Sequence, residues 1–114
     1  MTIESDLKVF HSLSDLPGRE LIPGYRGKFI HSATMTAAYW DIQGGNSVPE
    51  HSHPHEMIVN ILEGEFELTV GGETRRMRGG DVAIVPSNVP HSALAITDCR
   101  CVDVFSPPRT EYQN

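Results

Sequence analysis

The sequence has few cysteines, an excess of acidic over basic residues, and no long apolar run. Its 114 residues include two cysteines, and Lys and Arg number 9 against 15 for Asp and Glu, which gives a net charge of −6. Nucleic-acid-binding domains normally carry a basic patch, so we expect no nucleic-acid partner. No segment approaches the roughly 18 apolar residues of a membrane helix, so we expect no membrane association.

Targeting and disulfide signals are also missing. The opening residues MTIESDLKVF lack the basic and apolar regions of a signal peptide. Cys99 and Cys101 are separated by one residue, and a disulfide across that spacing would be strained. Reduced cysteines are typical of a reducing compartment. We therefore expect a cytoplasmic protein.

Helical signals are weak, and only residues 12–22 suggest one short helical turn. Glycine and proline interrupt the chain at short intervals, and apolar and polar residues alternate between them, as in MIVNI (57–61) and FELTV (66–70). A period of two with frequent turns is typical of strands in a sandwich or barrel. Gly71-Gly72 suits a tight hairpin turn. The pattern predicts an all-β fold with little helix.

The densest chemical signal is HSHPHEM at residues 51–57. On a strand, His51 and His53 would share one face. His91 follows GDVAIVPSNVP (80–90), where we expect a buried strand and a turn. It begins the next predicted strand and is the natural third member. Neutral imidazole is a common ligand for Zn, Ni, Cu and Fe, so the three histidines predict a metal site; the alternative is a surface decorated with histidines. His55 follows a proline in a predicted turn, and we place it at the rim.

A second signal lies in RCVDVFSPPR (100–109). Aspartate is disfavoured in strands, yet Asp103 shares a predicted face with Cys101 and Phe105. A buried carboxylate is costly unless it is paired, which suggests catalysis, a structural ion pair, or an exposed edge position. Arg109 follows two prolines, and its guanidinium matches a substrate carboxylate; the alternative is a solvated tail charge.

Two segments resemble the motifs of the cupin superfamily, whose members are small metal-binding barrels of the jelly-roll type. They are GNSVPEHSHPHEMIVNILEG (45–64) and GDVAIVPSNVPHSALA (80–95). The matching residues are Gly45, His51, His53 and Gly64 in the first motif, and Gly80, Pro86 and His91 in the second. Asn88 replaces a glycine, which is tolerable because Asn also adopts positive φ, and Ala95 replaces an asparagine. The resemblance covers about residues 35–105.

The resemblance implies a cupin jelly-roll β-barrel, also called a double-stranded β-helix. We expect one domain over residues 1–114, with N-terminal strands or an arm at 1–33, the barrel at 34–106 and a tail at 107–114. A homodimer is also expected, because cupins commonly pair through sheet edges. The apolar pairs that could supply the second face are Val102 with Val104, or Trp40 with Ile42.

Met57 departs from the cupin pattern, which has a glutamate ligand there. A thioether is a poor ligand for Mn, Fe, Ni or Zn and suits Cu(I). We favour a site in which Met57 lines the barrel and the metal keeps three histidines plus water, a workable catalytic set. The alternatives are a weak or empty site and direct coordination of copper by Met57.

A closer resemblance is to the KdgF group of small cupins, through HSHPHE, NVPHSA, DCR and DVFSPPR. Members are reported to open the ring of unsaturated monouronates in pectin and alginate breakdown. Residue 57 is typically a glutamine ligand in that group, so Met57 departs here too. The resemblance implies that Asp103, Phe105 and Arg109 are functional, and that Phe105 and Arg109 contact the substrate.

The sequence therefore predicts a cupin that binds Ni, Zn, Mn or Fe and linearises an unsaturated sugar acid. Asp103 would move the proton, Arg109 would hold the carboxylate, and Phe105 would shape the pocket. Ring opening needs no redox cofactor, and the chain contains no dinucleotide-binding fingerprint. The alternatives are another metal-dependent cupin enzyme, such as a dioxygenase or isomerase, and a non-enzymatic binding module with a weakened metal site.

Overall fold

The computed structural model describes residues 8–113, which form ten strands and two single-turn 3-10 helices. In chain order the elements are η1 (Leu13–Asp15), β1 (Arg19–Ile22), β2 (Tyr25–His31), β3 (Thr36–Ile42), β4 (Ser47–His51), β5 (Glu56–Glu63), β6 (Glu65–Val70), β7 (Glu73–Arg78), β8 (Val82–Val85), β9 (His91–Ala95), β10 (Cys99–Ser106) and η2 (Thr110–Tyr112). The all-β prediction is confirmed, including the helical turn within 12–22. Within the described residues, no helix has the length and apolar character needed to span a membrane.

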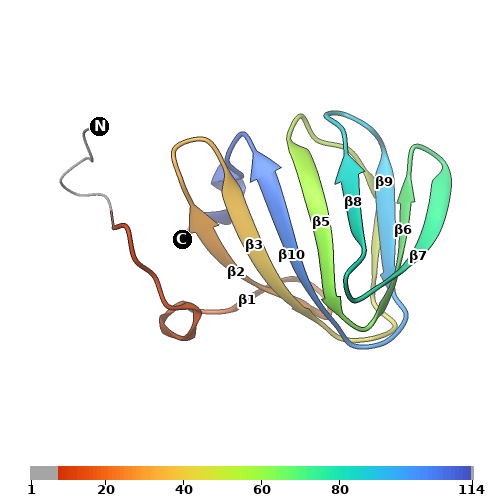
Figure 1. Ribbon diagram of the computed structural model, residues 1–114, viewed down its shortest axis with the longest axis horizontal. Helices are drawn as coiled ribbons and strands as arrows, with labels where there is room; N and C mark the ends of the chain where they lie inside the picture. Colours follow the sequence, from red (N-terminus) through yellow and green to blue (C-terminus); the bar gives the residue numbers. More distant parts are fainter. Residues whose placement is uncertain (1–7, 114) are drawn as a thin grey trace.

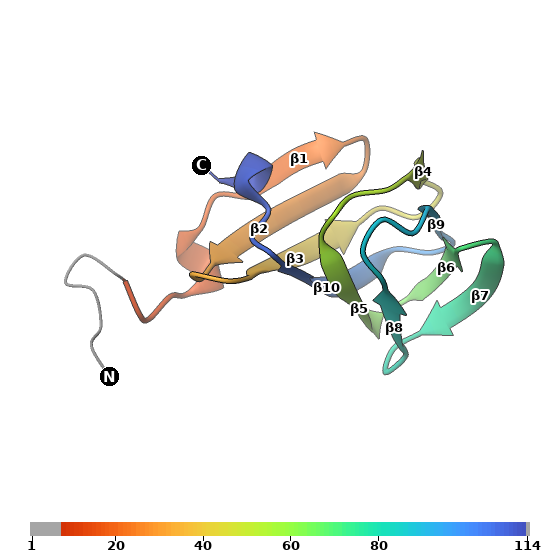
Figure 2. The ribbon, with the colours of Figure 1, turned by 90° about the horizontal axis from the view of Figure 1, so that it is seen from above.

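The strands form two antiparallel sheets. Figure 1 shows most strands of the larger sheet side by side, and Figure 2 shows the molecule from above. The larger has the order β1-β2-β3-β10-β5-β8, and the smaller has the order β4-β9-β6-β7. Apolar side chains alternate inward along the strands and bury against the other layer. The buried side chains include Trp40, Ile42, Val59, Ile61, Phe66, Leu68, Met77 and Val85. This core surrounds the space in which the candidate site lies.

Two turns follow the local chemistry of the sequence. Gly71 and Gly72 connect β6 to β7 with φ values of 56° and 85°, as the predicted tight hairpin requires. Asn88, which replaces the motif glycine, has φ of 65° and is the one non-glycine residue of the described chain with positive φ. Asparagine tolerates this region better than most residues, so the replacement keeps the turn before β9.

Strand β5 follows the predicted alternation, whereas β8 differs from expectation. Met57, Val59 and Ile61 are buried. The segment at β8 was expected to be buried, but Val82 and Ile84 are 59% and 64% exposed. The reason is that these side chains lie on the outer face of the larger sheet, where Ile58 of β5, which pairs with Ile84, is also exposed. One face of β8 therefore reaches solvent.

One prediction about the outer surface is wrong. Trp40 and Ile42 were candidates for an apolar dimer face, but both are buried in the core. Alternate residues of a strand point to the same side of the sheet. Trp40 and Ile42 therefore share the inner face of β3 with buried Ala38. Val102 and Val104 are only partly buried, so this alternative pair stays available.

The two cysteines pack inside the fold. Cys99 and Cys101 lie on β10 and are free and buried. Burial raises the pKa of both thiols, which keeps them protonated near neutral pH. The expected reduced pair is therefore a pair of small core side chains.

Candidate metal and substrate site

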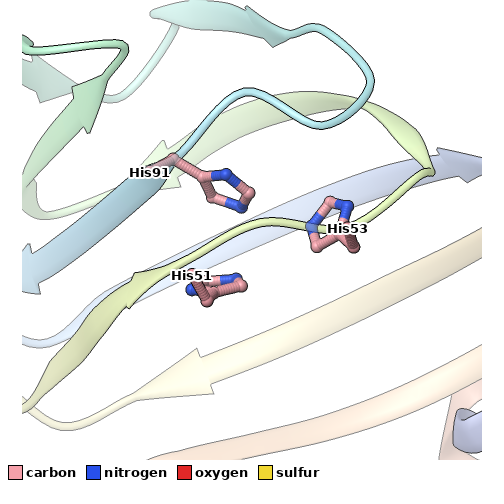
Figure 3. Close-up of side chains that lie close together, drawn as sticks. All are labelled: His51, His53 and His91. Atoms are coloured by element: carbon pink, nitrogen blue, oxygen red, sulfur yellow. The ribbon is translucent and has the colours of Figure 1, made fainter.

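Three histidines meet at the end of the smaller sheet (Figure 3). His51 is the last residue of β4, and the antiparallel register pairs it with His91, the first residue of β9. Their ring centroids are 4.2 Å apart, and that of His53 lies 4.7 Å from that of His91. One ligand nitrogen from each ring lies within 4.8 Å of the other two. The structure thus brings together the three predicted ligands.

His53 reaches the cluster differently from the prediction. His51 and His53 were expected to share a strand face, but β4 ends at His51. His53 lies in the following loop, and its carbonyl accepts a hydrogen bond of 2.8 Å from the Asn88 backbone N–H. Ser87 Oγ also donates to the Pro54 carbonyl at 2.5 Å. These bonds tie the loop of the first motif to the turn of the second, and they hold His53 beside His91.

Backbone carbonyls fix the orientation of all three rings. The Nδ1 atoms contact carbonyl oxygens two residues away, at 2.9 Å for His51 with Pro49, 3.0 Å for His53 with His55, and 2.8 Å for His91 with Val89. A carbonyl can only accept, so each Nδ1 carries the hydrogen. With the hydrogen on Nδ1, the Nε2 atom is the one that can bind a metal, which is the usual arrangement of metal-binding histidines.

The free nitrogens fit a divalent transition metal. Within residues 8–113, Nε2 of His53 and of His91 is buried without a hydrogen-bond partner. A buried unsatisfied acceptor costs about 1–3 kcal/mol, and a metal would satisfy both atoms at once. Burial lowers the pKa of His53 to about 4 and also lowers that of His91. Both rings are thus neutral at neutral pH, as metal binding requires.

His55 and Met57 lie next to this cluster in the chain but outside the set of three. The His55 carbonyl contacts Nδ1 of His53, and the His55 side chain is partly buried. Met57 is buried on β5, where it pairs with Phe105 and Val85 on the neighbouring strands. It lines the same cavity as the histidines. The thioether therefore serves as an apolar wall.

A cavity of about 330 Å³ lies between the sheets beside the histidines. Ligand pockets span about 300–1,000 Å³, so this one suits a molecule of roughly monosaccharide size. Its charged or polar wall residues include His51, His53, His91, Ser92, Asp103 and Arg109. The rest of the wall is mostly apolar, which favours a ligand held at a few defined polar points.

Asp103 places a carboxyl in this wall from β10. Its Oδ2 accepts a hydrogen bond of 3.0 Å from Trp40 Nε1, and its Oδ1 is buried without a partner in the described chain. Burial raises the pKa of Asp103 to about 7, against the opposing effects of Trp40 and Arg109. A group with a pKa near the working pH can both accept and release a proton. The alternative of an exposed edge carboxylate is excluded.

Arg109 is held over the cavity by aromatic rings. Its guanidinium carbon lies 4.8 Å from the Phe105 ring centroid and 4.5 Å from that of Tyr112, within the range of cation–π attraction. Its backbone N–H donates to Thr36 Oγ1 at 2.9 Å. Within residues 8–113, its guanidinium hydrogen-bonds only through Nε, to Glu111. Arg109 is thus an ordered cavity residue, and its terminal amino groups stay available.

Phe105 connects the two parts of the site. The ring is buried and lies edge-on to His53, with centroids 5.9 Å apart. The ring also packs against Arg109 and Tyr112. The same side chain therefore packs against a candidate metal ligand and a candidate substrate clamp.

Sequence reasoning missed two residues of the site. Tyr112 was not singled out, although its spacing from Arg109 suits one helical turn. Trp40 was considered only as part of one of two alternative apolar pairs for a dimer face, yet it donates to Asp103. The alternation of Trp40 with Ala38 and Ile42 predicted a strand with one apolar face. It did not show whether that face packs in the core or lies on the surface.

Comparisons with known proteins agree with this geometry. The family model described as a cupin domain matches residues 38–105. The pectin degradation protein KdgF of Dickeya dadantii is 26% identical over 101 residues, which cover 86% of this chain and 92% of that protein. The structure of KdgF from Halomonas sp. has a TM-score of 0.87 at 27% identity, and the match covers 94% of this chain and 100% of that one.

A shorter similarity joins the chain to quercetin 2,3-dioxygenase of Bacillus subtilis. It is 42% identical over 50 residues, which cover 42% of this chain and 14% of that protein. The family match itself spans more than half of the chain and includes both histidine motifs. From this match and the two facing sheets, the chain belongs to the cupin family and has its jelly-roll fold.

Proposed function

We propose that this cupin binds a divalent transition metal through His51, His53 and His91 and opens the ring of an unsaturated monouronate. The observation that carries the proposal is a single cavity lined by three convergent imidazoles, a carboxyl whose pKa is about 7, and an ordered arginine. Similarity to proteins described as KdgF, a pectin degradation protein, supports the substrate class. The metal would be Ni, Zn, Mn or Fe.

A bound metal would supply Lewis acidity and would orient an oxygen atom of the substrate. Arg109 binds the uronate carboxylate through its terminal amino groups, in the two-pronged geometry that guanidinium favours. Phe105 and Tyr112 both pack against the guanidinium, so little freedom is lost when the substrate binds. The apolar wall, including Met57, excludes water from the sugar ring.

Asp103 moves the proton. As a carboxylate, it removes the proton from the hydroxyl on the anomeric carbon, and that carbon forms a carbonyl as its bond to the ring oxygen breaks. The electron pair of the broken bond passes to the ring oxygen, which takes the proton back from Asp103. The product is an open-chain aldehyde and enol, which tautomerises to a ketone. No electrons enter or leave, so no redox partner is needed.

Proton NMR on the wild type tests this proposal. Incubation with an unsaturated monouronate should remove the vinyl proton signal of the substrate, while a saturated uronate of the same charge stays unchanged. The similarity to a quercetin dioxygenase favours one rival, because three histidines and open positions could also bind iron and O₂. Oxygen uptake with no loss of the vinyl signal would support that rival and contradict ring opening.

We further propose a homodimer formed through the outer face of the larger sheet. Ile84 pairs with Ile58 across β8 and β5, and Ile58 pairs with Val104 on β10, so these side chains form one apolar row. Leu62 and Val82 are also exposed nearby. A contiguous exposed apolar patch is typical of an interaction surface, and a second copy would cover it symmetrically.

Replacing Ile58 with Lys should convert the dimer to a monomer, because a charge would be buried at the centre of the row. Sedimentation velocity at several protein concentrations measures the mass. Thr74→Lys adds the same charge on β7 of the other sheet and should leave the dimer intact. A wild type that sediments as a monomer at all concentrations would contradict the interface.

A further inference from the structure

We propose that Trp40 is a positioning residue, which holds the Asp103 carboxyl so that Oδ1 is the oxygen that carries the catalytic proton. The catalytic part of this inference rests on the proposed function. The positional part concerns one hydrogen bond inside the fold and can be tested without any substrate.

Trp40 and Asp103 face each other across neighbouring strands. In the register of β3 and β10, Trp40 pairs with Cys101, and Asp103 pairs with Ala38. The two side chains are therefore diagonal neighbours on the inner face of the sheet. Trp40 Nε1 lies 3.0 Å from Asp103 Oδ2, a normal hydrogen-bond length.

The indole ring has little freedom to move. It makes edge-to-face contacts with Tyr25, Phe29 and Tyr112, at centroid distances of 6.2, 5.5 and 6.2 Å. Gly27 pairs with Trp40 across β2 and β3, and a Cβ atom at Gly27 would lie 2.8 Å from the indole ring. The absence of a side chain at Gly27 leaves space for the ring. The position of the Nε1–H donor is thus set by packing on several sides.

The chemistry of indole makes the two carboxyl oxygens unequal. Indole N–H is a donor and not an acceptor, so it can neither take up nor relay the proton. The bond to Oδ2 persists in both the ionised and the protonated forms of Asp103 if the acid proton binds to Oδ1. That oxygen is buried and has no partner within residues 8–113. Trp40 therefore determines which oxygen exchanges the proton.

The charges around Asp103 determine in which direction its pKa changes when the indole N–H is lost. Arg109 favours the carboxylate form, as does the bond from Trp40. The other titratable neighbours are Cys101, Tyr25 and Tyr112, whose pKa values are raised mainly by burial. They are neutral near pH 7 and add no competing charge. Loss of the indole N–H should consequently make the carboxyl harder to ionise.

The chain contains a single tryptophan, so an ¹⁵N-labelled sample gives one indole N–H cross-peak. We expect this peak to shift across neutral pH with one midpoint, because its acceptor changes charge. The same titration of Asp103→Asn should show no such midpoint. An indole peak that does not titrate in the wild type, or that titrates equally in Asp103→Asn, would overturn the positioning role.

The single tryptophan also permits an isosteric replacement. Growth of a tryptophan auxotroph on β-(3-benzothienyl)alanine puts sulfur in place of N–H at this position alone and keeps the ring shape. The acid limb of the kcat/KM profile should move to higher pH by about one unit, the size expected for one hydrogen bond to a charged group. KM at high pH should change little, since the replaced atom does not contact substrate.

An unchanged pH profile with full activity would overturn the inference. Trp40→Phe is a second variant that also removes the donor, and it should move the acid limb in the same direction. Failure of the wild type to open uronates would contradict the proposed function instead. In that case the indole titration still decides whether Trp40 holds Asp103.

Discussion

Replacing Asp103 with Asn is expected to lower kcat for ring opening by about 100- to 10,000-fold, the usual contribution of a general acid–base group. Asn has nearly the same shape, and its carbonyl oxygen can still accept the bond from Trp40 Nε1. It cannot take a proton from the substrate. KM should therefore change much less than kcat, and the melting temperature should stay close to that of the wild type.

The pH dependence of wild-type activity should also reflect the ionisation of Asp103. Burial raises the pKa of Asp103 to about 7, and the carboxylate is the form that accepts the first proton. The value of kcat/KM should thus be full above this pKa and fall as pH drops through it. Asp41→Asn is a matched control, because Asp41 is exposed on β3 and pairs with Arg100. Full activity of Asp103→Asn would exclude the proposed mechanism.

Replacing His91 with Ala is expected to weaken metal binding by more than about 100-fold, because the loss of a group that merely supports a ligand already costs about 10–100-fold. His91 is buried and belongs to the group of three histidines that could hold a metal in the described part of the chain. Met57 offers no comparable replacement, since a thioether is a poor ligand for these metals. Competition with a coloured chelator measures the affinity.

His11→Ala is the control for this experiment, because His11 is an exposed histidine bonded only to the Lys8 carbonyl in the described chain. A chelator should lower the melting temperature of the wild type and of His11→Ala, because the folded state loses a bound ligand. The chelator should change the melting temperature of His91→Ala very little. Equal affinities of the wild type and His91→Ala would contradict the three-histidine site.

Sequence patterns predicted the parts of the fold that depend on local spacing. The alternation in β5 and β6 and the Gly71-Gly72 turn are properties of short segments, so they could be read directly. The same alternation could not show that Trp40 faces the core, because a period of two defines two faces and does not identify the inner one. Nor could it show that β8 is an edge strand, which depends on the order of strands in the sheet.

The candidate site divides in the same way. His51, His53 and His91 were found because their spacing matches a motif, although the strand end at His51 was not predicted. Asp103 was found because aspartate is unusual in a strand. Its partner was missed, because the register of β3 and β10 joins residues 63 positions apart. Contacts between distant segments of this kind set the pKa of the carboxyl.

The most direct test of the central claim is the metal dependence of uronate opening. The wild type would be stripped with a chelator, dialysed, and divided into samples with and without one equivalent of Ni, Zn, Mn or Fe. Proton NMR would then follow the vinyl signal of an unsaturated monouronate. We predict that the stripped protein is nearly inactive and that at least one metal restores turnover in the wild type but not in His91→Ala. Turnover that is the same in stripped and reloaded protein, or absent with every metal, would contradict the claim.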